Sequence, residues 1–220
     1  MHQIETKSLR ERVINMLRVA IVNGELKPGQ ALIGTELANQ VGVSQATMRD
    51  AISTLSVEGL VDTVAYHVPT VKAISQKDIE DLFSVRIMME VFAIREIISK
   101  NQTTIAIREL YEVCNEMKEA AESESLTGVN WSDRKFHDTL IKHSGNQLLN
   151  VLWNTVATRV QQAISLHNHQ LGDLPQIASN HLAITQVIEN NDVNKATELI
   201  VAHIGVVADL IAVDWKKLNI

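Results

Sequence analysis

The sequence predicts a mainly α-helical protein in two parts. The first is a winged helix-turn-helix over residues 1–74, and the second is an all-helical antiparallel bundle over residues 75–220. Aromatic residues make up 4% of the chain and there are three prolines, which favours helices. Residues 35–61 have the pattern of two short helices around a tight turn, and two β-prone runs follow. Beyond residue 75, long segments of helical apolar spacing alternate with short breaks, as in a bundle.

The formal net charge of −6 is unevenly distributed along the chain. Residues 1–75 hold seven Lys or Arg and seven Asp or Glu, whereas residues 76–220 hold thirteen and nineteen. The second part therefore carries the whole excess of six negative charges. A neutral first part can bind nucleic acid only where its few basic side chains share one face.

The single cysteine, Cys114, excludes an internal disulfide framework and fits a reducing compartment. Its position between Val113 and Met117 on an apolar face predicts a core residue rather than a nucleophile. No apolar run approaches a membrane span, and the N-terminus lacks the layout of a signal peptide. We therefore expect a cytoplasmic protein that has no membrane partner.

The first expected helix covers residues 9–23, with Ser8 as its N-cap. Thr35 is the expected N-cap of the next helix, and Gly42 marks the turn because it tolerates positive φ. Ser44 then caps a second helix, and its inward positions are expected to be Met48, Ala51, Ile52 and Leu55.

Two β-prone runs, residues 60–64 and 68–71, surround Ala65-Tyr66-His67 and predict a two-stranded wing. With the wing, the preceding helices are better interpreted as a DNA-binding motif than as an ordinary helical hairpin. Such a motif inserts the start of its second helix into the major groove. The side chains expected to contact DNA are Ser44, Gln45, Thr47, Arg49 and His67.

The second part is expected to contain six helices, bounded by Gly, Asn and Pro breaks. Gly128 is placed in a loop before the third of them, and residues 172–175 form a break before the fifth. The expected helices cover residues 78–100, 103–124, 131–143, 148–171, 177–189 and 193–217.

Several short motifs in residues 8–72 resemble the N-terminal domain of the GntR family of bacterial transcription regulators. The chain departs from that family at Gln45, where an arginine is usual, and at Ala65-Tyr66-His67, where a Gly- and Arg-rich wing tip is usual. The resemblance therefore implies DNA binding with two typical arginines missing. The matching runs are Gly24-Glu25-Leu26-Lys27-Pro28-Gly29, Leu37-Ala38, Gly42-Val43-Ser44, Arg49-Asp50-Ala51 and Glu58-Gly59-Leu60-Val61.

Residues 76–212 resemble the all-helical ligand-binding domain of the FadR subfamily of that family, called FCD. The order and spacing of the motifs carry this resemblance, since each one alone is weak. The matching residues are Asp81-Leu82-Phe83, Arg86, Glu90, Phe136-His137, Ser144-Gly145-Asn146, Leu148-Leu149, His181 and His203.

Four residues of this part form a candidate metal site. Asp133 and His137 are four positions apart and so share a helical face, while His181 and His203 lie on the last two expected helices. Three imidazoles and a carboxylate suit a divalent ion such as zinc or nickel. The alternative is that each histidine is a solvated polar residue, as we expect for His2, His143, His167 and His169. Metal-binding FCD proteins use an Asp-x-x-x-His pair and two later histidines, which these four positions match.

An ion held by four protein ligands keeps one or two positions open on a five- or six-coordinate shell, and a small organic acid could fill them. The resemblance places Arg86 in the effector cavity, where its planar fork suits a carboxylate. The alternative for Arg86 is a salt bridge to Glu90 at i+4. Arg159 is a second candidate for effector binding.

We therefore expect a homodimeric, ligand-responsive bacterial transcription regulator and not an enzyme. Its partners would be double-stranded operator DNA and a small organic acid. Two alternatives use the same His/Asp cluster: a metal-dependent hydrolase, and a sensor for which the ion itself is the signal. No separate general base with a surrounding motif is evident, and a hydrolase has no need of a wing.

Overall fold

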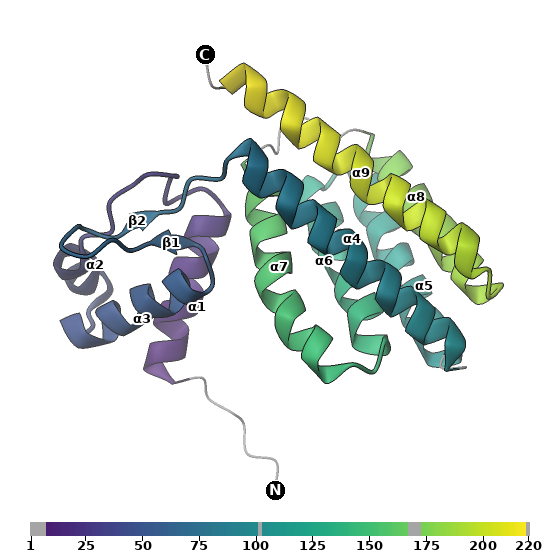
Figure 1. The fold of residues 1–220 in the computed structure, drawn as a ribbon, viewed down its shortest axis with the longest axis horizontal. Helices are drawn as coiled ribbons and strands as arrows, with labels where there is room; N and C mark the ends of the chain where they lie inside the picture. The colour runs from purple at the N-terminus through teal and green to yellow at the C-terminus, as the bar shows by residue number, and fades with distance from the viewer. Residues whose placement is uncertain (1–7, 101–102, 167–172, 219–220) are drawn as a thin grey trace, which may run out of the picture. The chain divides into compact units, whose positions relative to one another are not determined.

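Figure 1 shows the computed structural model, which describes residues 8–100, 103–166 and 173–218. The chain divides into two compact units. One runs up to Ser75 and includes residues 161–166, and the other takes residues 76–160 and the chain beyond residue 166. The fold class is mainly α, as predicted. No helix in the described ranges is long and apolar enough to cross a membrane.

The described part of the first unit contains three helices and two short strands: α1 (Leu9–Val22), α2 (Gly34–Val41), α3 (Gln45–Val57), β1 (Val61–Asp62) and β2 (Thr70–Val71). Ser8 caps α1 in a capping box, because its Oγ accepts the backbone N–H of Glu11 and its own N–H donates to the Glu11 carboxylate. Gly42 ends α2 at φ 73°, and Ser44 caps α3 by accepting the Thr47 N–H. These three sequence predictions are confirmed.

The core of this unit lies between α1, α3 and the wing. The predicted inward positions of α3 are at most 4% exposed, which confirms them: Met48, Ala51, Ile52 and Leu55. Arg18 on α1 forms a two-pronged pair with Glu58 after α3, at 2.8 Å from Nε and 2.6 Å from Nη2. This pair fixes the first helix against the end of the third.

The wing is shorter than predicted, since only two residues of each run pair. β1 and β2 are antiparallel, with Val61 opposite Val71 and Asp62 opposite Thr70. Ala31 adds an isolated bridge to Thr70 on the other side. The prediction that Thr35 caps α2 is wrong. The first helical bond runs from the Leu37 N–H to the Ile33 carbonyl at 3.0 Å, so the N-cap is Ile33, two residues before Thr35, and it offers no side-chain acceptor.

The described part of the second unit contains six helices, of which the fourth extends at residues 161–165 into the first unit: α4 (Gln76–Ser99), α5 (Thr103–Glu122), α6 (Leu126–His143), α7 (Gln147–Ser165), α8 (Leu174–Glu189) and α9 (Val193–Leu218). α5 packs against α6 and α8, whereas α4 packs against α9 and α6, and α8 also packs against α9. Cys114 lies inside this bundle at 4% exposure, with its Sγ 3.5 Å from Thr185 Oγ1, so its predicted core position is confirmed.

Three predicted boundaries in the bundle are wrong for local reasons. Gly128 lies inside α6, where its N–H donates to the Oγ of the N-cap Ser125; a Cβ there would lie 2.8 Å from Ala120 Cβ on α5. Pro175 lies in the first turn of α8, where a missing N–H leaves no helical bond broken. α7 ends at Ser165 rather than residue 171, and residues 167–171 lie outside the described part.

Candidate functional site

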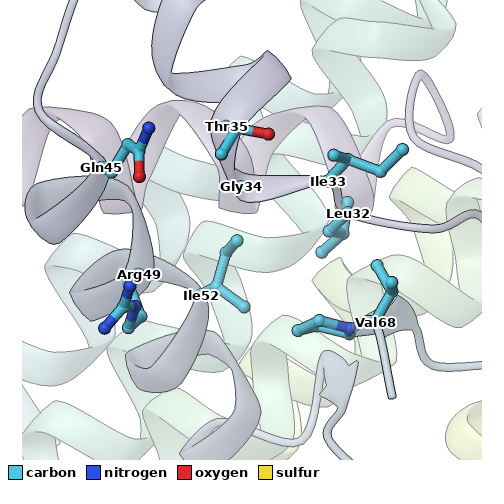
Figure 2. Close-up of a pocket in the computed structure, with 9 residues that line it drawn as sticks. Leu32, Ile33, Gly34, Thr35, Gln45, Arg49, Ile52 and Val68 are labelled. Carbon is cyan, nitrogen blue, oxygen red and sulfur yellow. The ribbon is translucent and has the colours of Figure 1, made fainter. Parts of the chain in front are cut away.

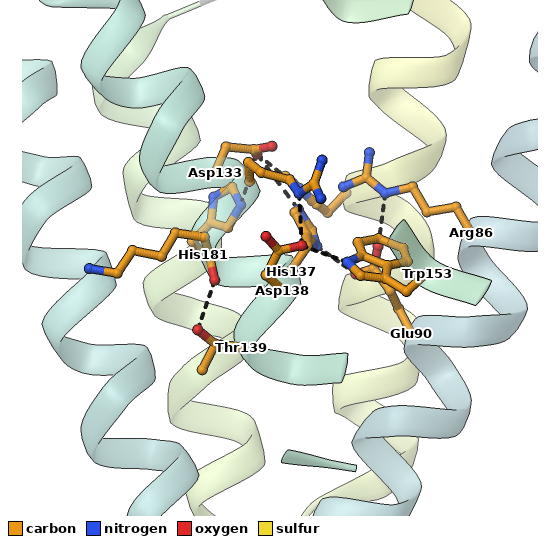
Figure 3. A network of polar contacts seen from close by, with 11 residues as sticks. Arg86, Glu90, Asp133, His137, Asp138, Thr139, Trp153 and His181 are labelled. Carbon is orange, nitrogen blue, oxygen red and sulfur yellow. Dashed lines mark hydrogen bonds and ion pairs between the residues drawn. The ribbon is translucent and has the colours of Figure 1, made fainter. Parts of the chain in front are cut away.

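Four side chains from three helices of the bundle lie together, and Figure 3 labels three of them, Asp133, His137 and His181. Asp133 and His137 are on α6, His181 is on α8 and His203 is on α9. From Asp133 Oδ1, the Nε2 atoms of His181, His137 and His203 lie at 3.1, 3.7 and 4.0 Å. The four sequence-predicted metal ligands thus lie together, with all their candidate ligand atoms within 4.8 Å of one another.

The three Nε2 atoms are buried and have no hydrogen-bond partner within the described residues. Leaving a buried polar atom unsatisfied costs roughly 1–3 kcal/mol. Three such atoms around one carboxylate form an arrangement that an acceptor of their lone pairs would complete. A divalent cation does this, whereas an isolated polar lining would place each ring against its own partner.

The other ring nitrogen is already engaged in two of the three histidines. His181 Nδ1 lies 2.8 Å from the carbonyl oxygen of Ile177, and His137 Nδ1 lies 2.5 Å from Glu90 Oε2. A neutral ring that donates from Nδ1 keeps its Nε2 lone pair free for a metal. Both rings are therefore held in the tautomer that a ligand needs.

The spacing of the donors is compatible with one ion. Two atoms bound at about 2.1 Å from the same ion lie at most about 4.2 Å apart. The three distances from Asp133 to the histidines meet this limit. The candidate ligand atoms that lie up to 4.8 Å apart must move slightly closer to bind the same ion. One carboxylate with three imidazoles is a donor set for zinc, nickel or a similar ion rather than for calcium or magnesium.

Electrostatics favour an anionic Asp133 and a neutral His203. By contrast, the charges of Glu90 and Asp133 outweigh burial and raise the pKa of His137, so a cation must displace a proton from that ring. Burial alone would raise the pKa of Asp133, yet its interactions with the nearby His137 and His181 rings hold that pKa well below its usual range. Burial, followed by repulsion from His181 and His137, holds the pKa of His203 well below 6.5. The site therefore offers an anionic oxygen beside a neutral imidazole.

Arg86 forms an ion pair with Glu90, which the sequence analysis gave as the alternative to effector binding. Its Nε lies 2.8 Å from Glu90 Oε1, and both side chains are at most 2% exposed. Its charge disfavours protonation of His137 and His203, so the guanidinium is close enough to act on the cluster, although the charges of Glu90 and Asp133 raise the pKa of His137 overall. Arg159 instead has its Nη2 3.3 Å from Asp78 Oδ1 on α4.

Sequence reasoning missed the role of Glu90 and misjudged His143. Glu90 occupies an inward position of α4, one helical turn from Arg86, and a carboxylate among apolar positions was the available signal. His143 was expected to be solvated, but its side chain is 13% exposed and its Nε2 lies 3.0 Å from Glu109 Oε2. His2, His167 and His169 lie outside the described residues.

A second candidate site lies on the first unit, where α3, the start of α2 and the wing enclose a cavity of about 400 Å³ (Figure 2). Gln45 and Arg49 lie at its edge, with Leu32, Ile52 and Val68 among the apolar residues lining it. Arg49 is exposed and has no recorded ion pair in the described part of the chain.

The other predicted DNA-contacting residues lie on the same unit. Ser44 is occupied as a helix cap and lies 2.9 Å from Thr47 Oγ1, whereas His67 is exposed at the wing tip, with its Nδ1 3.0 Å from the Ala65 carbonyl oxygen. Gln45, Arg49 and His67 are thus exposed, while Ser44 has a structural role as a helix cap.

A winged helix-turn-helix joined to a helical domain with a polar, buried cluster defines a transcription regulator. Residues 9–65 match the family described as bacterial regulatory proteins, gntR family, and residues 81–206 match the FCD domain. The chain therefore belongs to the GntR family and carries an FCD domain, and it is a regulator rather than an enzyme. GntR regulators bind operator DNA, and FCD domains bind small-molecule effectors.

The gluconate operon transcriptional repressor of Bacillus subtilis is 23% identical over 186 residues, which is 82% of this chain and 76% of that protein. The solved structure of E. coli McbR/YncC has a TM-score of 0.80 at 19% identity and covers 96% of this chain and 100% of its own. A metal-free FCD domain has a TM-score of 0.57 at 23% identity, covering 66% of this chain and 99% of its own. At these identities, the structural likeness establishes the fold alone.

Proposed function

We propose that the chain is a homodimeric regulator that reads operator DNA through α3 and the wing. Its FCD domain holds one divalent ion, zinc or nickel, with a small organic acid beside it. The observation that carries the proposal is the convergence of three buried, unpartnered Nε2 atoms on Asp133 Oδ1. The relatives act in transcription, so this cluster serves as a sensor site, and the hydrolase alternative is not favoured.

The helical domain provides the means for a ligand to alter the regulator. The four ligands lie on α6, α8 and α9, so an ion would tie three helices together. A carboxylate in an open position would extend these ties toward Arg86, which lies close enough to influence His137 and His203. A ligand with different affinity for two helix arrangements shifts the balance between them and so changes DNA binding.

An apolar surface on α4 and α7 supports the homodimer. The inward faces of these helices meet through Met89, Ala93, Trp153 and Ala157. Their outer faces carry large apolar side chains that are between 41% and 66% exposed, namely Met88, Phe92, Leu148, Val151 and Leu152. A second copy of the chain is the occupant we propose, because a small, neutral DNA-binding unit needs a partner unit to bind a palindromic operator.

Selection from fragmented genomic DNA followed by footprinting tests the DNA-binding half of this proposal. We expect a short palindrome to be enriched at low salt. If the dimeric protein enriches no sequence, the proposal that it binds a specific operator is contradicted.

Elemental analysis and native mass spectrometry of the purified chain test the ligand half. We expect one divalent ion per chain and a small organic acid released on denaturation. DNA release on adding zinc or nickel alone would instead favour the direct metal sensor. Absence of stoichiometric metal after exposure to either ion would contradict the metal site.

A further inference from the structure

We infer that Glu90 is a positioning residue of the His/Asp cluster: its carboxylate orients His137 for metal binding, and the positive charge of Arg86, on the other Glu90 oxygen, opposes the bound cation. The inference rests on the proposed metal site and assigns a role to two residues outside the four ligands. Figure 3 shows Arg86 and Glu90 on α4, beside the ligands on the neighbouring helix α6.

The three side chains form one continuous chain of contacts. Arg86 Nε donates to Glu90 Oε1 at 2.8 Å, and Glu90 Oε2 lies 2.5 Å from His137 Nδ1. The three side chains are 2%, 0% and 1% exposed. Each Glu90 oxygen thus has its own partner, and the second oxygen fixes the ring whose Nε2 faces Asp133.

A purely structural ion pair does not account for this arrangement. An i,i+4 pair on one helix is complete with a single contact between Arg86 and Glu90, and buried ion pairs add little stability relative to apolar residues. The second carboxylate oxygen instead reaches across to α6 and contacts the candidate ligand. A carboxylate behind a ligating histidine raises the basicity of the ring and sets its tautomer.

The charges of these residues also define which anion the loaded site would accept. With neutral histidines, the carboxylates of Asp133 and Glu90 and the guanidinium of Arg86 leave one net negative charge. A divalent ion would change this to one net positive charge. A ligand with a single carboxylate at the metal would therefore neutralise the buried site, which gives the effector class a monoanionic headgroup.

Zinc affinity of the full chain, measured by competition with a chromophoric chelator and without organic acid, tests this inference. Glu90→Gln keeps an oxygen acceptor but removes the charge, so we expect zinc affinity to fall by about 10–100-fold, the usual range for such supporting residues. Arg86→Gln removes the opposing positive charge, so zinc affinity should stay equal or rise. If Arg86 and Glu90 formed only a structural ion pair, the Glu90→Gln and Arg86→Gln variants would change zinc affinity in the same direction.

Glu96→Gln is the matched control, because Glu96 lies on the same helix and pairs with Lys100 at i+4 away from the histidines. We expect its zinc affinity to stay within about twofold of wild type, since such exposed pairs are weak. The melting temperature of each metal-free variant reports whether it folds. If Glu90→Gln does not fold, the zinc affinity of Arg86→Gln tests the inference instead. A lower affinity in Arg86→Gln than in wild type contradicts the inference.

Normal zinc binding by wild type with unchanged affinity in Glu90→Gln overturns the role of Glu90 and leaves the metal site standing. Absence of stoichiometric zinc in wild type overturns the metal site itself, and this inference with it.

Discussion

Asp133 Oδ1 on α6 lies 3.1 Å from His181 Nε2 on α8, although the two residues are far apart in the sequence. This contact is the shortest recorded one between the carboxylate and an imidazole of the cluster. It links two helices that both pack against α5 and also contact each other. A ligand placed here therefore acts on the packing of the bundle rather than on one helix.

His181→Ala and His203→Ala should each lower the zinc content of the purified chain and remove the difference in melting temperature between zinc-loaded and chelator-treated protein. Each substitution removes one of the converging nitrogens, and a ligand at 100 times its Kd stabilises a fold by about 2.7 kcal/mol. Elemental analysis and thermal melts measure both effects. His67→Ala, in the exposed wing, is the control and should change neither. Equal zinc content in all three variants would falsify the ligand assignment.

Arg49→Ala should weaken operator binding, because Arg49 is an exposed cation that lines the α3 cavity beside Gln45. If Arg49 contacts a phosphate, the salt dependence of log K should lose about one unit of slope. If it contacts a base edge, the loss should be about 1–3 kcal/mol and confined to one position of the operator. Fluorescence anisotropy at several salt concentrations separates the two. Arg12→Ala, exposed on α1, is the control, and equal losses in both variants would contradict a specific role.

Gln45→Arg should tighten operator binding, because the family usually has an arginine at this first position of α3. Gln45 is exposed, so the longer side chain can be accommodated. A bidentate arginine–guanine pair adds roughly 1–3 kcal/mol where the operator presents a guanine. The dissociation constant for the selected operator measures the gain. An unchanged constant, both for that operator and for variants with guanine at each position, would show that residue 45 does not face the bases.

Leu148→Glu and Val151→Glu should shift the chain from dimer to monomer, because each places a charge in the proposed apolar interface on α7. Both residues are about two-thirds exposed in the single chain, so neither change should unfold it. Sedimentation analysis measures the oligomeric state. Ile105→Glu, on α5 and 57% exposed, serves as a matched apolar-to-charged control and should leave the dimer intact. A dimer that survives both α7 substitutions places the interface elsewhere.

Glu109→Gln should destabilise the fold near neutral pH. Hydrogen bonds from Lys142 and His143 lower the pKa of Glu109 from 4.5 to about 2. The folded-state pKa is depressed, so the stabilisation is fully present above the unfolded value and is lost as pH falls toward about 2. The melting temperatures of wild type and variant should therefore converge between about pH 4.5 and 2. Glu112→Gln, exposed on the same helix, is the control, and a constant difference across that range contradicts the linkage.

Local features were predictable from the sequence because their partners lie within one helical turn. Ser8 and Ser44 cap the helices that follow them, and Asp133 shares a face with His137 because 3.6 residues make a turn. Apolar periodicity likewise predicted the inward face of α3 and the mainly α fold. The errors at this level, at Thr35 and Gly128, arose where backbone bonding or close helix packing overrode a residue's usual preference.

The tertiary structure decided which distant polar groups meet. Glu90 reaches His137, Arg159 pairs with Asp78 and His143 pairs with Glu109 because of how each helix is rotated against its neighbour. Local spacing carries no information on that rotation, since it is set by the packing of apolar side chains across whole helices. The sequence by itself therefore determined the fold class, the family resemblance and the four candidate ligands. Packing alone determined that their Nε2 atoms lack a hydrogen-bond partner among the described residues and that the buried Glu90 carboxylate contacts His137.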